Sequence, residues 1–145
     1  MAQMSFTEDQ KKAIETQGQN ILVAAAAGSG KTRVLVERII SQVCSKALSL
    51  DRVLVLTFTK AAAAEMRERI EAALNEKINA LALEGGAAAD LHEDIVLLER
   101  QRVLLTGADI STFHSFCQRL IQSHIDATEI PPTFRIASEQ EIRLL

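Results

Sequence analysis

A short Ala- and Gly-rich loop between an apolar run and an amphipathic helix is the feature that most constrains this chain. Ile21-Leu22-Val23 predicts a buried strand, and the loop after it is Ala25-Ala26-Ala27-Gly28-Ser29-Gly30-Lys31-Thr32. Small residues let backbone N–H groups point at a triphosphate, while Lys31 suits its β and γ oxygens and the Thr32 hydroxyl suits Mg²⁺. The helix that follows directs the positive end of its dipole at the phosphates. The pattern therefore predicts a nucleotide-binding α/β domain.

The loop departs from the usual phosphate-binding pattern at its first position, where Ala25 replaces glycine. The alternative interpretation is an Ala/Gly-rich turn between a strand and a helix that binds no ligand. The strand-loop-helix context is the one that the motif requires, and it favours the nucleotide-binding interpretation.

Length and composition indicate one globular domain rather than a disordered chain. The chain has 145 residues, of which 48% are hydrophobic, enough to form a core. A net charge of −3 argues against a strongly basic nucleic-acid module, although a local DNA site needs only a few backbone contacts and stacking faces. No apolar run reaches the ~20 residues that span a bilayer, and the first residues do not resemble a signal peptide. We expect a cytoplasmic protein without membrane association.

The two cysteines fall on apolar stripes of predicted helices. Cys44 and Cys117 are far apart in sequence, a spacing that does not indicate a metal site or a disulfide framework. We interpret both thiols as packing residues in a reducing compartment.

Periodicity along the chain predicts strands that alternate with helices. Thr7 and Gln10 have the spacing of a capping box, which begins a helix over 8–16. Apolar residues at helical spacing predict further helices, with Glu65 and Arg69 paired on the long one. The remaining expectations are strands over 20–25, 52–58 (covered on both faces), 108–111 and 133–136, helices from Lys31 to about 47, over 61–83 and 91–105, a linker over 84–90, and a final helix capped by Ser138 and Glu141. This alternation favours an α/β layer with a parallel sheet.

The segment from 113 to 124 has the most regular apolar pattern of the chain. Its apolar positions recur at i, i+3, i+4, i+7 and i+8, which predicts one buried helix face. The members of this face are Phe113, Phe116, Cys117, Leu120, Ile121 and His124. His114 and Ser115 fall outside it and are expected to face outward near the start of the helix, whereas His124 is expected at the edge of the core.

Three further segments resemble motifs of one protein family. They are Phe6-Thr7-Glu8-Asp9-Gln10 with Ala13-Ile14, Leu56-Thr57-Phe58-Thr59-Lys60-Ala61-Ala62 with Glu65-Met66, and Ser111-Thr112-Phe113-His114-Ser115-Phe116. In this order they resemble the adenine-reading, first DNA-contact and second DNA-contact motifs of the Rep/UvrD-like superfamily 1 helicases. Within that superfamily, residues 20–32, 111–117 and 134–137 are most similar to the AddA family, the large helicase-nuclease subunits of bacterial AddAB recombination complexes.

The resemblance implies a RecA-like P-loop motor domain, a parallel sheet flanked by helices, that is incomplete here. Residues 1–145 would form its amino-terminal part, with a helical segment over 61–105 and the start of a further subdomain near 127–145. Later strands of the domain are expected beside the loop strand, so we expect that strand to lack its neighbours. The implied parent is an ATP-dependent DNA helicase with exonuclease activity that acts on DNA ends in double-strand break repair and recombination. It would form a heterodimer with an AddB-type partner.

The resemblance also assigns site residues. The ATP-binding set is Gln10, Ala25, Ala26, Ala27, Gly28, Ser29, Gly30, Lys31, Thr32 and Arg33, with Mg²⁺ bound through ATP and Thr32. The DNA-binding set, for single-stranded or double-stranded DNA ends, is Thr57, Phe58, Thr59, Lys60, Thr112, His114 and Ser115. The side chains suit these roles, since the Gln10 amide can read an adenine edge and an aromatic face such as that of Phe58 can stack on a base.

Residue chemistry leaves alternatives open at three of these positions. Gln10 could serve only as a helix cap, Arg33 could be a solvated helix residue, and Phe58 could close the core. Two other function classes also remain: a P-loop kinase or phosphotransferase, which needs no DNA segments, and a non-catalytic nucleotide-binding or assembly module.

No segment predicts the acidic strand that hydrolysis requires. A motor of this kind needs a carboxylate for Mg²⁺ and water, and arginines for the transferring phosphate. Ile95-Val96-Leu97-Leu98-Glu99 is the nearest match, but it has one carboxylate and lies in a predicted helix. By resemblance, the catalytic residues lie beyond Leu145, and we predict ATP binding without turnover.

Overall fold

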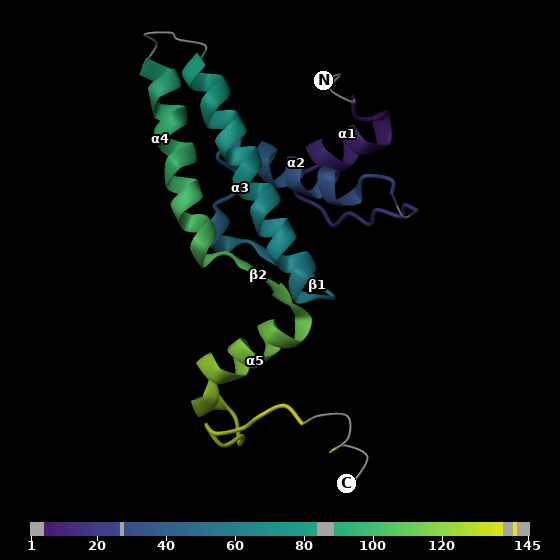
Figure 1. Ribbon diagram of the computed structural model, residues 1–145, viewed down its shortest axis with the longest axis vertical. Helices are drawn as coiled ribbons and strands as arrows, with labels where there is room; N and C mark the ends of the chain where they lie inside the picture. Colours follow the sequence, from purple (N-terminus) through teal and green to yellow (C-terminus); the bar gives the residue numbers. More distant parts are fainter. Residues whose placement is uncertain (1–4, 27, 84–88, 138–140, 142–145) are drawn as a thin grey trace.

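The computed structural model describes residues 5–26, 28–83, 89–137 and 141. The elements in chain order are α1 (Glu8–Glu15), α2 (Lys31–Cys44), the 3-10 turn η1 (Leu50–Arg52), β1 (Leu54–Thr57), α3 (Lys60–Leu83), α4 (Ala89–Leu104), η2 (Leu105–Gly107), β2 (Asp109–Thr112), α5 (Phe113–Ser123) and η3 (Ile125–Ala127). The long helices α3 and α4 run side by side, α1 lies beside α2, and α5 extends from the sheet away from the α3–α4 pair (Figure 1). Within the described residues, no helix is long and apolar enough to cross a membrane.

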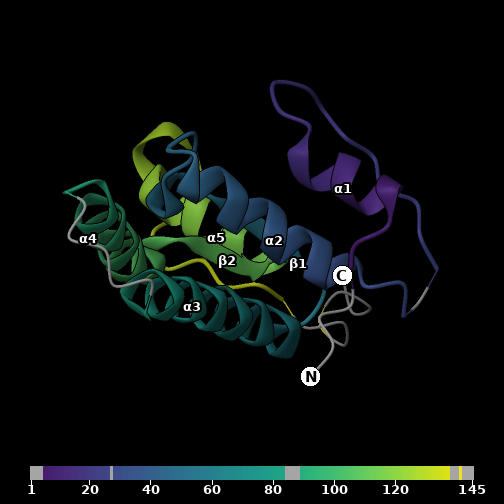
Figure 2. The same ribbon diagram turned by 90° about the horizontal axis from the view of Figure 1, so that it is seen from above.

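The two strands form a parallel pair, which confirms the α/β fold with a parallel sheet. Their register runs from Leu54 opposite Asp109 to Thr57 opposite Thr112. The helix α3 packs against both strands, and the view from above shows the sheet between α2 and α3 (Figure 2). The architecture is a small parallel sheet flanked by helices, consistent with part of a RecA-like fold.

The expectation that β1 is covered on both faces is wrong. Val55 is buried, but Leu54 and Leu56 remain 48% and 39% exposed. Since side chains alternate between the two faces of a strand, this pattern means that only the Val55 face is covered by the described elements. A continuous apolar run is typical of a strand buried on both sides, and here the second cover is not part of the described chain.

The main core lies between α2, α3, α4 and the sheet. The long helix α3 contributes its predicted apolar face, and Ile70 and Leu74 are fully buried. Arg69 donates to Glu65 on the same helix at 3.0 Å, as its i, i+4 spacing predicted. The full set of buried core residues is Val36, Ile39, Ile40, Val43, Leu50, Val55, Ala63, Met66, Ile70, Leu74, Ile78, Leu98, Leu105, Ala108 and Ile110.

Polar side chains close this core where backbone groups would otherwise lack partners. The buried Gln101 amide accepts a hydrogen bond from the Leu50 N–H at 2.8 Å. Arg67 donates to the carbonyl oxygens of Leu105 and Ala108, the latter at 2.9 Å. Buried backbone groups need such partners, so these two side chains fix how α4 and η2 join the sheet.

A second, much smaller core joins α1 to α2. It consists of Ala13, Ile14 and Val34, with Phe6 packed against it. The predicted capping box is confirmed, because the Thr7 hydroxyl accepts from the Gln10 N–H and the Gln10 side chain accepts from the Thr7 N–H. The helix α1 ends one residue before the predicted 8–16 boundary.

Residues 20–26 do not form the strand that the sequence predicted. Ile21, Leu22 and Val23 are 38%, 96% and 48% exposed. A strand needs a neighbour to pair its backbone N–H and C=O groups, and the sheet of the described chain contains only β1 and β2. The segment is unpaired, as expected for a loop strand without its neighbours. The predicted strand over 133–136 is likewise not formed.

The predicted buried face of α5 is also wrong. No residue of this helix is buried, and Phe113 and Leu120 are 60% and 47% exposed. His124, expected at a core edge, is exposed and follows the last turn of α5. The helix contacts the end of the sheet, and its apolar stripe has no cover within the described residues. The expected linker over 84–88 and the expected cap at Ser138 lie outside the described residues.

Candidate nucleotide and nucleic-acid site

Backbone geometry defines the end of the phosphate-binding loop. Gly28 and Gly30 have φ of 77° and 80°, in the left-handed region that favours glycine. Gly30 is the N-cap of α2, which therefore begins at Lys31 directly after the loop. The first N–H groups of a helix have no partner within the helix, so α2 presents them at the loop. Ala27, a member of the predicted loop, lies outside the described residues.

Lys31 lies against the loop that it is predicted to serve. Its Nζ donates to the carbonyl oxygens of Ala25 at 2.8 Å and Ala26 at 2.7 Å. The ammonium is therefore positioned by the loop backbone, and the side chain itself is exposed. A phosphate oxygen could exchange for either carbonyl without a change in the backbone.

Gln10 is both a helix cap and a loop contact. Its Oε1 accepts from the Thr7 N–H at 2.9 Å, and its Nε2 donates to the Ser29 carbonyl at 3.1 Å. The cap interpretation was thus correct but incomplete, because the same amide joins α1 to the loop. These residues line a cleft of about 210 Å³ formed by Thr7, Asp9, Gln10, Ala13, Val23, Ala24, Ala25, Ser29, Lys31 and Val34.

Arg33 lies on the first turn of α2, one residue after Thr32. Its guanidinium carbon is 4.3 Å from the centroid of the Phe6 ring, a cation–π contact. Phe6 in turn packs on the small core under α1. The alternative of an entirely solvated Arg33 is wrong. No local pattern indicates this contact, since Phe6 and Arg33 are far apart along the chain.

Arg38 is a structural residue that no sequence pattern indicated. Its place on the polar side of α2 suggested a solvated position, but the side chain is half-buried. Its Nη1 donates to the carbonyl oxygens of Ala13 at 2.7 Å, Ile14 at 3.3 Å and Thr16 at 2.5 Å. A basic residue that binds the last carbonyls of a neighbouring helix has no local sequence signature.

The two predicted DNA segments meet at one edge of the sheet. The parallel register places Thr57 opposite Thr112, so both strands end at the same edge and both α3 and α5 begin there. The Thr59 hydroxyl accepts from the Ala62 N–H at 3.0 Å. At the start of α5, the Thr112 hydroxyl accepts from the Ser115 N–H at 3.2 Å and donates to the Ser115 hydroxyl at 2.9 Å.

The side chains at this edge are open to solvent. Phe58 is fully exposed, which excludes the alternative that it closes the core. His114 faces outward as predicted, and Lys60 is exposed as well. Beside them lies a cleft of about 370 Å³, lined by Lys60, Ala63, Ala64, Arg67, Glu68, Ile110, Ser111, Thr112, Ser115 and Arg119.

Comparison with known proteins agrees with this arrangement. The model of the UvrD/REP helicase N-terminal domain matches residues 6–145. The chain belongs to this family. The resemblance that the motifs predicted is thus confirmed.

Curated relatives of this helicase-family chain are named as the A subunit of an ATP-dependent helicase/nuclease. The protein from Lachnoclostridium phytofermentans is 48% identical over 147 residues, which cover 100% of the chain and 10% of the relative. Those from Geobacillus thermodenitrificans and Staphylococcus saprophyticus are 49% and 46% identical, and each covers 97% of the chain. The chain spans about a tenth of the length of these relatives.

One acidic candidate of this helicase-family chain is set aside by the structure. Residues 95–99 form part of α4 rather than a strand, as predicted. Glu99 forms an ion pair with Arg102 on the same helix at 2.5 Å. The carboxylate therefore stabilises the surface of α4 and does not lie at the end of a strand, where Mg²⁺ coordination would require it.

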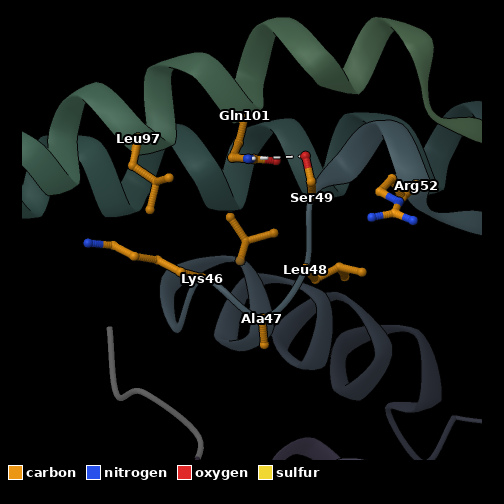
Figure 3. A pocket seen from close by; sticks show the side chains of 8 residues that line it. Lys46, Ala47, Leu48, Ser49, Arg52, Leu97 and Gln101 are labelled. Atoms are coloured by element: carbon orange, nitrogen blue, oxygen red, sulfur yellow. Dashed lines mark hydrogen bonds between the residues drawn. The ribbon is translucent and has the colours of Figure 1, made fainter.

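A further cavity lies away from all the predicted site residues. It has a volume of about 460 Å³ and lies between α4 and the turn that follows α2 (Figure 3). Leu97 and Gln101 project into it from α4, and the Gln101 Nε2 donates to the Ser49 hydroxyl at 3.4 Å. Lys46 and Arg52 lie at its two ends.

Proposed function

We propose that this chain binds Mg²⁺ and ATP through the loop at 25–32. The observation that carries the proposal is that the loop, the start of α2 and the Gln10 amide lie together around one cleft. Lys31 would exchange its carbonyl contacts for the β and γ oxygens, and Thr32 would bind the Mg²⁺ ion. Gln10 would read the adenine edge with its donor and acceptor, and Arg33 would lie near the nucleotide.

We further propose that the sheet edge binds single-stranded DNA. Two helix N-termini and several hydroxyl groups meet there, which suits backbone phosphates. The exposed Phe58 ring offers a stacking face for a base. Thr57, Thr59, Lys60 and the segment from Thr112 to Ser115 would contact the strand around it.

We infer the role of the whole protein from its relatives. Their name supports one component of an ATP-dependent helicase and nuclease, which we propose acts on DNA ends in double-strand break repair and recombination. A component named in this way implies an assembly, and we propose that its second component is of AddB type. We propose that residues 1–145 contribute to the first RecA-like domain, with a further subdomain beginning near 127, and that the protein acts in the cytoplasm.

We propose that the 145-residue chain binds ATP without hydrolysing it. Hydrolysis needs a carboxylate beside the nucleotide, and Glu99 is instead paired on the surface of α4. Phosphate release by the chain that is lost in Lys31→Ala would contradict this part of the proposal.

Equilibrium binding of a fluorescent ATP analogue with Mg²⁺ tests the nucleotide site. We expect saturable binding that Lys31→Ala abolishes, because the variant removes the ammonium that contacts the phosphates. Lys77→Ala is the matched control, since Lys77 is an exposed lysine of α3 far along the chain from the loop. Equal binding by the wild-type chain and Lys31→Ala would overturn the proposal.

Titration with a fluorescent oligo(dT) at several salt concentrations tests the DNA site. Phe58→Ala should weaken binding by about 1–3 kcal/mol through the loss of one stacked base. The control is Leu83→Ala, which removes an exposed apolar side chain at the opposite end of α3. ATP binding with no salt-dependent DNA binding would instead favour the kinase or the non-catalytic nucleotide-binding alternative.

A further inference from the structure

The Gln10 side chain is carried by a helix that is weakly held. The helix α1 has eight residues, and an isolated helix of that length is marginal in water. Its packing against α2 is limited to Ala13, Ile14 and Val34, with Phe6 beside them. The position of Gln10 therefore depends on contacts other than a large apolar interface.

Arg38 supplies such a contact at the far end of α1. Its Nη1 donates to the carbonyl oxygens of Ala13, Ile14 and Thr16, at distances of 2.7, 3.3 and 2.5 Å. The last carbonyls of a helix have no partner within the helix, and a cation there also complements the negative end of the helix dipole. One half-buried guanidinium thus joins the carboxyl end of α1 to the middle of α2.

The opposite end of α1 meets the loop. Gln10 donates from Nε2 to the Ser29 carbonyl, and its Nε2 lies 3.7 Å from the position that a Cβ on Gly30 would occupy. Since α2 begins at the loop, Arg38 and the loop belong to one rigid helix and its N-cap. The orientation of α1 on α2 therefore decides where the Gln10 amide lies relative to the loop.

We propose that Arg38 is a positioning residue for base recognition: by binding the carboxyl end of α1 it keeps the Gln10 amide beside the phosphate-binding loop. The inference rests on the proposed ATP binding at that loop. It predicts that Arg38 affects the selectivity for adenine and has little effect on the phosphates, which Lys31 and Thr32 would contact from α2 itself.

The test compares three ligands on the 145-residue chain: Mg·ATP, Mg·GTP and Mg·tripolyphosphate. Arg38→Met keeps a long unbranched side chain but cannot donate to the three carbonyls. We expect it to weaken ATP binding about tenfold, the size of one lost hydrogen bond, and to reduce the ATP-to-GTP preference equally. Tripolyphosphate binding should stay within about twofold, since the hydrogen bonds of the loop remain. Arg100→Met, an exposed arginine of α4, is the control.

Two further variants separate positioning from a general loss of structure. Arg38→Lys should recover most of the ATP preference, because an ammonium can donate to several carbonyls at once. In a Gln10→Ala background, Arg38→Met should have no additional effect on the preference, since the residue through which it acts is gone.

The outcomes distinguish the inference from the proposed function. If Arg38→Met lowers ATP and tripolyphosphate binding equally, or leaves the ATP-to-GTP ratio unchanged, Arg38 is not a positioning residue while the nucleotide site stands. If the effects of Gln10→Ala and Arg38→Met on the ratio add, Arg38 acts by another route and the inference is overturned. If the wild-type chain binds none of the three ligands, the proposed function and the inference fail together.

Discussion

The two cores of this molecule differ in size and in what they position. The main core contains fully buried side chains such as Leu50, Ile70 and Leu74. The small core under α1 has Ile14 and Val34 as its main apolar residues, each 7% exposed. The candidate phosphate-binding loop adjoins the small core, so the groups that carry the proposed nucleotide chemistry lie on the less densely packed side of the molecule.

Hydrogen bonds compensate for the limited packing around the loop. The capping box of Thr7, the Gln10 contact with Ser29 and the Arg38 contacts with α1 all lie in this region. In the main core, by contrast, apolar burial fixes the helices and polar groups such as Gln101 only complete it. We therefore expect α1 and the loop to open locally at a lower free energy than the α2–α3–α4 unit.

The largest effect is expected in the main core. Leu74→Ala removes a fully buried side chain and should lower the free energy of unfolding by about 2–5 kcal/mol. Ile14→Ala should cost about 2 kcal/mol or less, because the small core can close around the lost atoms. Urea denaturation followed by far-ultraviolet circular dichroism measures both. Equal losses would show that the two cores unfold as one unit.

A buried amide should matter next. Gln101→Leu keeps the approximate volume but leaves the Leu50 N–H without its acceptor, and should cost about 1–3 kcal/mol. The control is Gln122→Leu at an exposed position of α5, where we expect a change within about 0.5 kcal/mol. The same denaturation experiment applies. A neutral Gln101→Leu would mean that packing alone holds α4 against η1.

A smaller, local effect is expected at the start of α1. Thr7→Ala removes the N-cap hydroxyl and should destabilise this helix by about 1 kcal/mol. Amide hydrogen exchange should show faster exchange in α1 and no change in α3, with Thr133→Ala as an exposed threonine control. Faster exchange in both helices would contradict the independence of the two cores.

Local patterns in the sequence predicted the elements well. Apolar spacing located α3 within one residue, and the Thr7–Gln10 spacing predicted a capping box that the structure contains. The order of the motifs also led to the correct family, and the parallel register then brought Thr57 and Thr112 together. Each of these features depends on neighbours in sequence or on a recurrent order of elements.

Features that depend on a distant partner were not predictable in the same way. An apolar pattern shows which face of a segment favours burial, but it does not show that a cover is present. Leu56 on β1 and Phe113 on α5 belong to such faces and are exposed. Arg38 failed in the opposite direction, because a charged residue on the polar side of a helix predicts solvent, whereas the docking of α1 covers it.

The smallest expected effect concerns Cys44, at the edge of the main core. Burial raises the pKa of the Cys44 thiol above its ordinary value, and nearby Lys77 opposes this only in part. A higher pKa means less thiolate at a given pH, so alkylation in a Cys117→Ser background should be several-fold slower at pH 8 than in the urea-unfolded chain. The rate should rise at a higher pH than for an ordinary thiol. Leu74→Ala should accelerate this reaction and Ile14→Ala should not, since only the first variant loosens the core against which Cys44 packs. Acceleration by both would mean that opening of α1 spreads into the main core.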